Sequence, residues 1–188
     1  MRDLSLHLMD IVQNSIRAQA KLIIIRMEYV RSGELTLMVK DDGLGMKPEL
    51  LSMVQNPFTT TRTERKIGLG IPLFTENARL TGGDVHIDST PGMGTTVTAV
   101  FHTRHIDCIP LGDIAGTMAA LVAANAQTPD FDFLLTSNGN EASLDTRVMR
   151  QALQEIALNE PEIVMWMRSS LQEEIQQVFG GTDYEIHR

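Results

Sequence analysis

The chain has 188 residues, of which 43% are hydrophobic, so it can bury the core of one good-sized domain or of a domain with a smaller companion. Its formal net charge of -8 argues against a surface that coats nucleic acid, because such binding relies on cations that replace counterions. The sequence contains one cysteine, no apolar run long enough to cross a bilayer and no signal-peptide pattern, so we expect a cytoplasmic protein without disulfides or membrane spans.

Hydrophobic periodicity and the placing of glycine and proline divide the first hundred residues into helices and strands. Helices are expected at residues 3–20, 48–55 and 70–80, and strands at residues 21–29, 34–40, 84–89 and 95–103. This order predicts an α+β fold, a two-layer α/β sandwich in which helices cover one face of a mixed or antiparallel sheet.

The composition changes after about residue 104, and we place a domain boundary between residues 104 and 110. Asp113 is expected to cap a helix that runs through Asn125, and Asn138–Gly139 to form a tight turn. A strand at residues 131–136 and helices at 146–158 and 161–179 complete the expected elements. The chain then divides into a domain 1–104 and a small C-terminal α/β extension 105–188, which matches no known motif and could carry an oligomer contact.

Two short motifs in the first domain place polar groups where a ligand could reach them. DIVQNS puts Asp10 and Asn14 one turn apart on a single helix face. DDGLGM puts Asp41 at the end of a strand and follows it with Gly43 and Gly45. Each motif alone is compatible with a solvated helix face or with ordinary turn chemistry.

A third motif, KIGLG, forms a glycine-tipped loop before the helix expected at residues 70–80. Gly68 and Gly70 let the backbone approach a polyphosphate, and a helix start offers unpaired N–H groups and the positive end of a dipole. Thr60, Thr61 and Lys66 add hydroxyl groups and positive charge just upstream. A lone Gly-x-Gly before a helix is often only a tight turn, so the phosphate site is predicted from the motifs together.

In this order the motifs resemble the GHKL ATPase superfamily, which joins the ATP-binding domains of gyrases, heat-shock chaperones, mismatch-repair proteins and histidine kinases. DIVQNS resembles the family's N box, DDGLGM its first glycine box, KIGLGIPL its second, and GGDVHIDSTPGMGTTVTAVF its closing strand–turn–strand. PFTTT before KIGLG is most similar to histidine-kinase catalytic domains and anti-sigma-factor serine kinases. The resemblance covers residues 3–101 and implies a Bergerat-type fold that binds ATP between helices and sheet, under a lid.

The resemblance also implies Mg²⁺ and assigns roles to single residues. Asn14 would supply an oxygen to Mg²⁺, a hard cation that bridges phosphates. Asp41 would accept a hydrogen bond from the adenine amino group, and the hydroxyl of Thr95 would join it. The other implied ATP-binding residues are Arg17, Gly43, Gly45, Met46, Thr60, Thr61, Lys66, Gly68, Leu69 and Gly70.

Asp10 is where the chain departs from the family pattern. Hydrolysing members and serine kinases usually carry Glu here, as the base that orients or deprotonates the nucleophile, and histidine kinases commonly carry Asn. Asp10 keeps the charge on a side chain that is one methylene shorter, so it is a candidate catalytic base. Three functions stay open: a kinase that phosphorylates a separate protein partner on His or Ser, a nucleotide-sensing binding module, and a slow ATPase.

Overall fold

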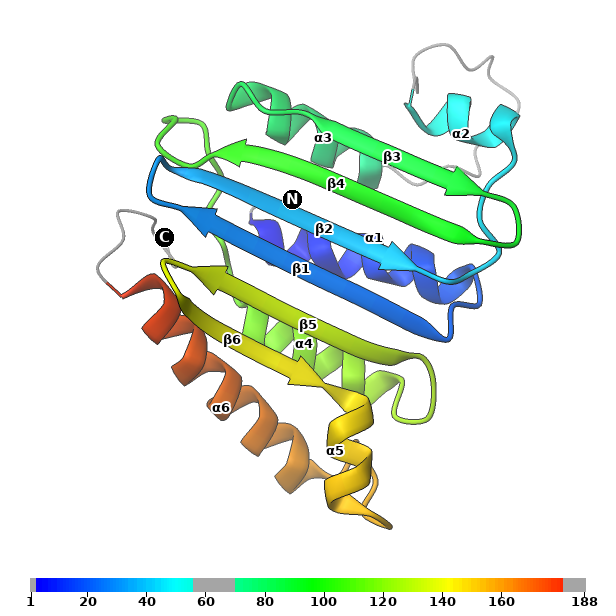
Figure 1. Ribbon diagram of the computed structural model, residues 1–188, viewed down its shortest axis with the longest axis vertical. Coiled ribbons are helices and arrows are strands. Elements are labelled where there is room, and N and C mark those ends of the chain that lie inside the picture. The colour runs from blue at the N-terminus through cyan, green and yellow to red at the C-terminus, as the bar shows by residue number, and fades with distance from the viewer. Residues whose placement is uncertain (1–2, 56–69, 181–188) are drawn as a thin grey trace.

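The computed structural model describes residues 3–55 and 70–180, which form one six-stranded sheet with the order β3-β4-β2-β1-β5-β6 (Figure 1). The strands are β1 (Leu22–Val30), β2 (Glu34–Asp41), β3 (Val85–Thr90), β4 (Gly94–His102), β5 (Asp130–Ser137) and β6 (Asn140–Asp145). The helices are α1 (Leu4–Arg17), α2 (Pro48–Gln55), α3 (Gly70–Leu80), α4 (Ile114–Ala124), α5 (Thr146–Leu153) and α6 (Pro161–Phe179).

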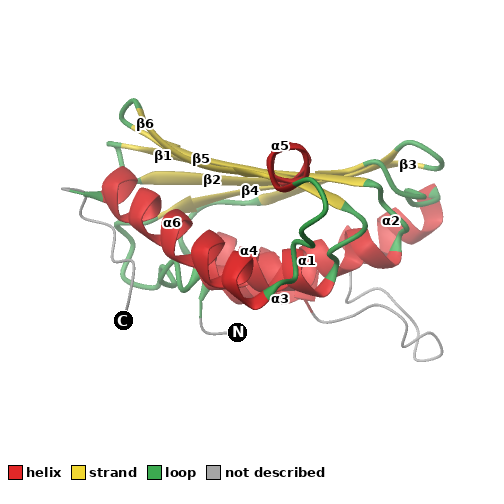
Figure 2. Ribbon diagram, turned by 90° about the horizontal axis from the view of Figure 1, so that it is seen from below, coloured by secondary structure: helices red, strands yellow, loops and turns green. Residues whose placement is uncertain are grey.

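Figure 2 shows α1, α3, α4 and α6 in one layer on a single face of this sheet, which confirms the predicted two-layer α+β sandwich. Neighbouring strands are antiparallel except for β1 and β5, which are parallel. Side chains alternate along each strand, so that Ile23, Ile25, Met27 and Tyr29 of β1 are buried beneath the helices. None of the described helices is long and apolar enough to cross a membrane.

Helix α1 ends at Arg17, three residues before the predicted end of the first helix. Gln19 has φ 60, in the left-handed region that ends helices. The chain turns here, and the carbonyl oxygen of Ala18 accepts a hydrogen bond from the Leu44 amide at 2.8 Å. The early end of α1 therefore ties this helix to the glycine-bearing loop after β2.

The sheet continues without a break across the predicted boundary between residues 104 and 110. Strand β5 pairs in parallel with β1 from Leu22↔Asp130 to Tyr29↔Ser137. The segment that leads from β4 to α4 also contacts α1, where the amide of Leu4 donates to the Pro110 carbonyl at 3.0 Å. The C-terminal half thus extends the same sheet and helix layer.

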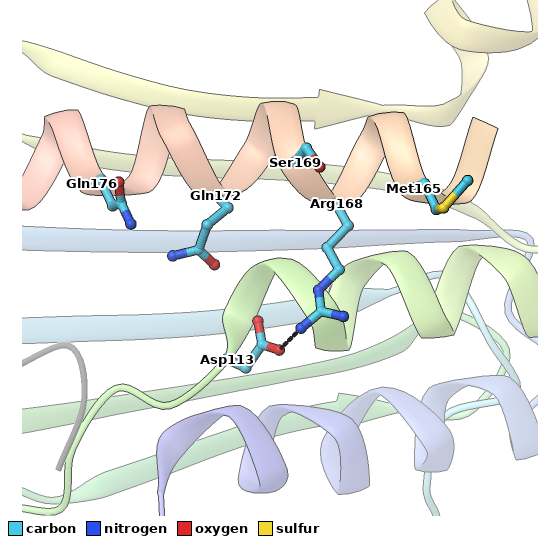
Figure 3. Close-up of a pocket in the computed structure, with 6 residues that line it drawn as sticks. All are labelled: Asp113, Met165, Arg168, Ser169, Gln172 and Gln176. Carbon is cyan, nitrogen blue, oxygen red and sulfur yellow. Dashed lines mark hydrogen bonds and ion pairs between the residues drawn. The ribbon is translucent and has the colours of Figure 1, made fainter. Parts of the chain in front are cut away.

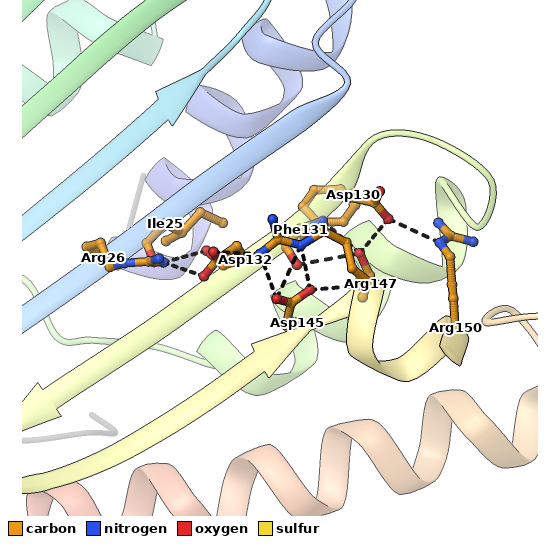
Figure 4. Close-up of polar contacts among 9 residues, drawn as sticks. Ile25, Arg26, Asp130, Phe131, Asp132, Asp145, Arg147 and Arg150 are labelled. Carbon is orange, nitrogen blue, oxygen red and sulfur yellow. Dashed lines mark hydrogen bonds and ion pairs between the residues drawn. The ribbon is translucent and has the colours of Figure 1, made fainter. Parts of the chain in front are cut away.

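Two aspartates face each other across β5 and β6, and cations from other elements neutralise them (Figure 4). Asp132 lies opposite Asp145, an arrangement that would be destabilising without a counter-ion. Arg147 of α5 reaches both, at 2.9 and 2.6 Å, and Arg26 of β1 contacts Asp132 at 2.7 Å. The hydrogen bond from Arg147 is the main cause that lowers the pKa of the Asp145 carboxyl.

The β5–β6 hairpin forms at the predicted Asn138–Gly139 turn, where both residues have positive φ, as a two-residue primed turn requires. Strand β6 itself was not expected from the sequence. The predicted cap at Asp113 is confirmed, since its side chain accepts from the Gly116 amide at 2.7 Å. Helix α5 is shorter than the predicted 146–158 because Gln154 has φ 53 and ends it.

Candidate functional site

A pocket of about 220 Å³ opens between α1, the end of β2 and the segment after it, α2, α3 and β4. It is bounded by apolar side chains on most sides and by a few polar groups at one wall. The lining residues are Ile11, Asn14, Ser15, Ala18, Asp41, Gly45, Met46, Leu50, Val54, Ile71, Thr95 and Val97. An apolar pocket with a few convergent polar groups is the usual form of a small-molecule site.

Asp41, at the end of β2, is the buried charged group of this wall and is only 6% exposed. Its Oδ1 accepts from the Gly43 amide at 2.9 Å and from the Thr95 amide at 3.2 Å. Its Oδ2 accepts from the Ser15 hydroxyl at 2.7 Å. These donors orient the carboxylate and leave Oδ2 with capacity for one more donor, which a ligand can supply.

Glycines let the backbone segments around Asp41 approach each other closely. Gly45 has φ +63, and a Cβ there would lie 2.0 Å from the Thr90 carbonyl oxygen. Gly94 has φ +96, and a Cβ there would lie 1.9 Å from the Asp41 carbonyl oxygen. Gly45, after β2, and Gly94, the first residue of β4, are therefore required by the packing of the pocket wall itself.

Helix α1 presents polar side chains at the rim of the pocket. Asn14 is exposed and lines the pocket, and its Oδ1 accepts from Arg17 Nη1 at 3.2 Å. Asp10, one turn earlier, lies against the first residue of α3: a Cβ on Gly70 would be 2.9 Å from Asp10 Oδ2. The structure thus brings a carboxylate, an amide oxygen and a guanidinium to the rim beside the start of a helix.

His7, a further turn towards the N-terminus, fixes α1 against α3. It is fully buried, its Nε2 lies 2.8 Å from Asn77 Nδ2, and its ring packs on Phe74 with centroids 5.2 Å apart. Burial is the main cause that lowers the pKa of His7 to about 4. The imidazole is therefore neutral near pH 7, and the contact between the two helices is uncharged.

The predicted site residues fall into four groups. Those that line the pocket are Asn14, Asp41, Gly45, Met46 and Thr95, and those directly beside them are Gly43, which donates to Asp41, and Arg17, which donates to Asn14. Asp10 and Gly70 contact each other next to this rim. Thr60, Thr61, Lys66, Gly68 and Leu69 lie outside the described residues.

Two serines hold the site together and were not predicted as site residues. Ser15 donates to Asp41, and Ser89 of β3 contacts both the Met46 amide and the Thr95 hydroxyl at 2.8 Å. Ser15 could have been found from its place directly after Asn14. Nothing in the sequence near Ser89 points to its contacts.

A larger hollow of about 560 Å³ lies elsewhere, between α4 and α6 (Figure 3). Its lining residues are Asp113, Met165, Arg168, Ser169, Gln172 and Gln176. The two charged side chains among them, Asp113 and Arg168, pair with each other at 2.8 Å. Because the hollow lacks a buried, oriented charge like Asp41, the smaller pocket is the better candidate site.

A metal ion at this pocket would need oxygen ligands from outside the protein. The described residues hold no group of three or more His, Cys, Asp or Glu side chains that could bind a metal ion. The exposed amide oxygen of Asn14 is a hard donor of the kind that suits Mg²⁺, which commonly takes only one or two protein ligands and completes its shell with waters and phosphates. The residues present therefore fit a magnesium ion that enters with a polyphosphate.

Comparison with known proteins gives a family match and several relatives. Residues 2–105 match the model of the family described as histidine kinase-, DNA gyrase B-, and HSP90-like ATPase. A putative sensor protein of Shewanella frigidimarina is 33% identical over 98 residues, which cover 50% of this chain and 15% of that protein. Sporulation kinase C of Bacillus subtilis is 29% identical over 92 residues, which cover 48% of this chain and 21% of that protein.

The cell-division control histidine kinase PdhS of Brucella ovis is 28% identical over 108 residues, which cover 50% of this chain and 10% of that protein. The chain thus spans between 10% and 21% of the length of these three relatives. Among solved structures, the N-terminal domain of a DNA repair protein superposes with a TM-score of 0.53 at 17% identity. That superposition covers 96% of this chain and 58% of the other, so the likeness in fold includes the C-terminal half.

Proposed function

The chain belongs to the family of histidine kinase-, DNA gyrase B-, and HSP90-like ATPases, and from this we propose that its pocket binds Mg²⁺-ATP and that it transfers the γ-phosphoryl group to a separate protein. The observation that carries the proposal is Asp41. It is a buried carboxylate held by three donors, with one acceptor position left beside an apolar pocket. An acceptor-only group in this place matches the exocyclic amino group of adenine.

The two ends of the pocket carry different polar groups, and this difference sets the orientation of the nucleotide. With the base at Asp41, the phosphates extend towards the rim, where Asn14, Arg17 and the start of α3 lie. The N-terminus of α3 favours negative charge, and the Arg17 guanidinium is within reach of the same rim. Base and phosphates are thereby bound by opposite ends of one site.

A bound magnesium ion would supply positive charge that neutralises the charge developing on the phosphates. Asn14 would hold it through Oδ1, the oxygen that now accepts from Arg17 at 3.2 Å. Arg17, on the same helix face, would pair with a phosphate oxygen, which a guanidinium binds well.

Asp10 is the residue that we propose as the base. It lies beside Gly70 at the start of α3, next to the place where the phosphates would end. In phosphoryl transfer the protein mainly positions the reactants, and a carboxylate here would orient or deprotonate the attacking hydroxyl or imidazole. The same carboxylate could orient a water molecule, so slow ATP hydrolysis is the second candidate activity.

The test is incubation with Mg²⁺ and γ-labelled ATP, with and without cell extract, for the wild type, Asp10→Asn and Glu76→Gln. Glu76 is an exposed acid on α3 and serves as the matched control. We expect a labelled second protein. The rate at which it is labelled should fall about a hundredfold in Asp10→Asn, because a positioned base contributes about that much, and should be unchanged in Glu76→Gln. Label released only as free phosphate would indicate an ATPase, and tight ATP binding without turnover would indicate a sensor.

A further inference from the structure

Helices α1 and α3 share two polar contacts. Beside the pocket, a Cβ on Gly70 would lie 2.9 Å from Asp10 Oδ2. Farther from the pocket, His7 Nε2 lies 2.8 Å from Asn77 Nδ2. Residue numbers rise along α3 as they fall along α1, so the two helices run antiparallel. The first contact belongs to the proposed phosphate end of the site, whereas neither residue of the second contact lines the pocket.

The contact between His7 and Asn77 is the one hydrogen bond that joins α1 to α3 within the described residues. Around it the helices meet through packing: the imidazole lies on the Phe74 ring with centroids 5.2 Å apart, and Phe74 packs in turn on Phe101 of β4. Apolar contacts have no preferred direction, whereas a hydrogen bond requires a defined distance and angle. The pair therefore defines where α3 lies along α1.

Stability alone does not explain a histidine at this position. His7 is fully buried, and its Nδ1 has no hydrogen-bond partner among the described residues. A buried polar atom without a partner destabilises the fold, and two apolar side chains of similar shape would be neutral or stabilising in the same place. What a buried polar pair can supply is a single arrangement of the elements that it joins, as it does in coiled coils.

The place of α3 along α1 matters at the other contact. Asp10 follows His7 by about one helical turn, and Gly70 precedes Asn77 by about two turns. Because a hydrogen-bonded helix moves as one body, a shift of α3 by one residue would move Gly70 by about 1.5 Å relative to Asp10. A displacement of about 1 Å between reacting groups can lower a rate about a hundredfold.

We propose that His7 and Asn77 are positioning residues that hold α3 at the place along α1 where Asp10 can act on the group that attacks the phosphate. The inference rests on the proposed function, because it requires Asp10 as the base. The pair acts on turnover through Asp10 and leaves the pocket wall around Asp41 unchanged, so ATP affinity does not depend on it.

The experiment removes this hydrogen bond without emptying the space that it occupies. One variant combines His7→Leu with Asn77→Leu, so that two apolar side chains replace the pair. His7→Gln is the conservative variant, because glutamine also ends in a donor and an acceptor. Phe101→Leu is the control, since it loosens the buried packing against Phe74 and keeps the hydrogen bond. Each protein is prepared with and without Asp10→Asn.

Three quantities are measured for each protein: the urea midpoint of unfolding, the ATP affinity by calorimetry, and the rate at which γ-label leaves ATP for protein or water. We expect the leucine pair to unfold at or above the wild-type midpoint. Its ATP affinity should stay within about threefold of the wild type, while turnover falls at least about tenfold. His7→Gln should recover most of the turnover, and Phe101→Leu should lower the midpoint but not the turnover.

The effect of Asp10→Asn shows whether the pair acts through this carboxylate. In the wild type the substitution should lower turnover about a hundredfold, because it removes a positioned base. In the leucine pair it should lower turnover by less than about threefold, because a misplaced carboxylate contributes little and the two effects are not additive. A merely structural role of the pair predicts the full effect of Asp10→Asn in both proteins.

The inference is overturned if the leucine pair keeps the wild-type turnover, or if Asp10→Asn keeps its full effect in that protein. Where the leucine pair does not fold, Asn77→Ala takes its place in the same comparison, since Asn77 is only half-buried. Both overturning results leave ATP turnover through Asp10 intact, so the proposed function stands. A wild type without turnover, or with turnover that Asp10→Asn leaves unchanged, overturns the proposed function and this inference together.

Discussion

Lowering the pH from 7 to 5 should destabilise the folded protein through His7. The side chain is 0% exposed, and its Nδ1 is buried without a hydrogen-bond partner among the described residues. Its other ring nitrogen contacts Asn77 at 2.8 Å. A charged imidazolium here would be poorly solvated, and burial accordingly lowers the pKa of His7 to about 4.

The sign of the effect follows from the two pKa values. The folded state keeps His7 neutral down to a pKa of about 4, whereas the unfolded chain takes up the proton near the ordinary value of 6.5. The contribution of neutral His7 to the free energy of unfolding is therefore fully present above pH 6.5 and is lost as the pH falls towards 4. Linkage gives a loss of about 2 kcal/mol between pH 7 and 5, rising to about 3 kcal/mol at pH 4.

Other groups contribute at lower pH. The pKa of the Asp145 carboxyl is lowered by its hydrogen bond to Arg147, so its contribution is lost only as the pH falls below the ordinary carboxyl range. The window between pH 7 and 5 therefore lies above the range in which the contribution of Asp145 is lost.

The assay is urea unfolding at pH 7, 6 and 5 for the wild type, His7→Gln and His102→Gln, the last being an exposed histidine that serves as the control. His7→Gln should be less stable at pH 7 but should lose less than about 1 kcal/mol across the window, since it cannot take up the proton. His102→Gln should follow the wild type. A wild-type free energy of unfolding that is flat between pH 7 and 5, or a slope that persists in His7→Gln, would contradict this role of His7.

Two substitutions test the site directly. In Gly70→Ala the new Cβ would lie 2.9 Å from Asp10 Oδ2, so the carboxylate must move by a few tenths of an ångström. We expect turnover of labelled ATP to fall, with little change in the urea midpoint of unfolding. Unchanged turnover would mean that Asp10 takes no part in the reaction. In Asp41→Asn the pocket loses a charged acceptor, which typically contributes about 1.5–3 kcal/mol, so calorimetry should show ATP affinity at least about tenfold lower. Full ATP affinity in Asp41→Asn would mean that the base binds elsewhere.

The sequence predicts the residues that would contact the nucleotide better than those that position them. Asp41, Gly45 and Thr95 belong to glycine-bearing motifs whose local backbone demands are visible in the chain. Ser15 and Ser89 act on partners 26 and 43 residues away, Asp41 and Met46. Hydrogen bonds of that range depend on how strands and helices pack, which no local pattern specifies.

The same distinction holds for the fold. The helix and strand types follow from hydrophobic periodicity, and the hairpin turn at Asn138–Gly139 from residues that accept positive φ. Strand β6, with the sequence NEASLD, has too few apolar residues to be predicted and forms because the hairpin places it beside β5. Alternation of buried and exposed side chains predicts a strand but not its neighbour in the sheet. The parallel pairing of β1 with β5 therefore could not be predicted from the sequence pattern.

That pairing leads to a last prediction, about a shortened chain. A protein that ends at residue 104 retains all the motifs of the proposed ATP site but lacks β5, β6 and the helices that follow. It would expose the backbone edge of β1 from Leu22 to Tyr29, together with the side of the core that Phe131 and Phe133 cover. An exposed, apolar strand edge promotes aggregation.

We therefore expect residues 1–104 to unfold at a much lower urea concentration than the full chain and to associate in sedimentation experiments. Phe133→Ala in the full chain is the matched control, because it removes one buried ring, at a cost of about 3–5 kcal/mol, and keeps the β1 edge paired. A shortened chain that stays monomeric, unfolds like the full protein and binds ATP equally well would show that residues 1–104 are an independent domain. Loss of stability beyond that of Phe133→Ala would instead show that the C-terminal strands are part of the same folding unit as the ATP site.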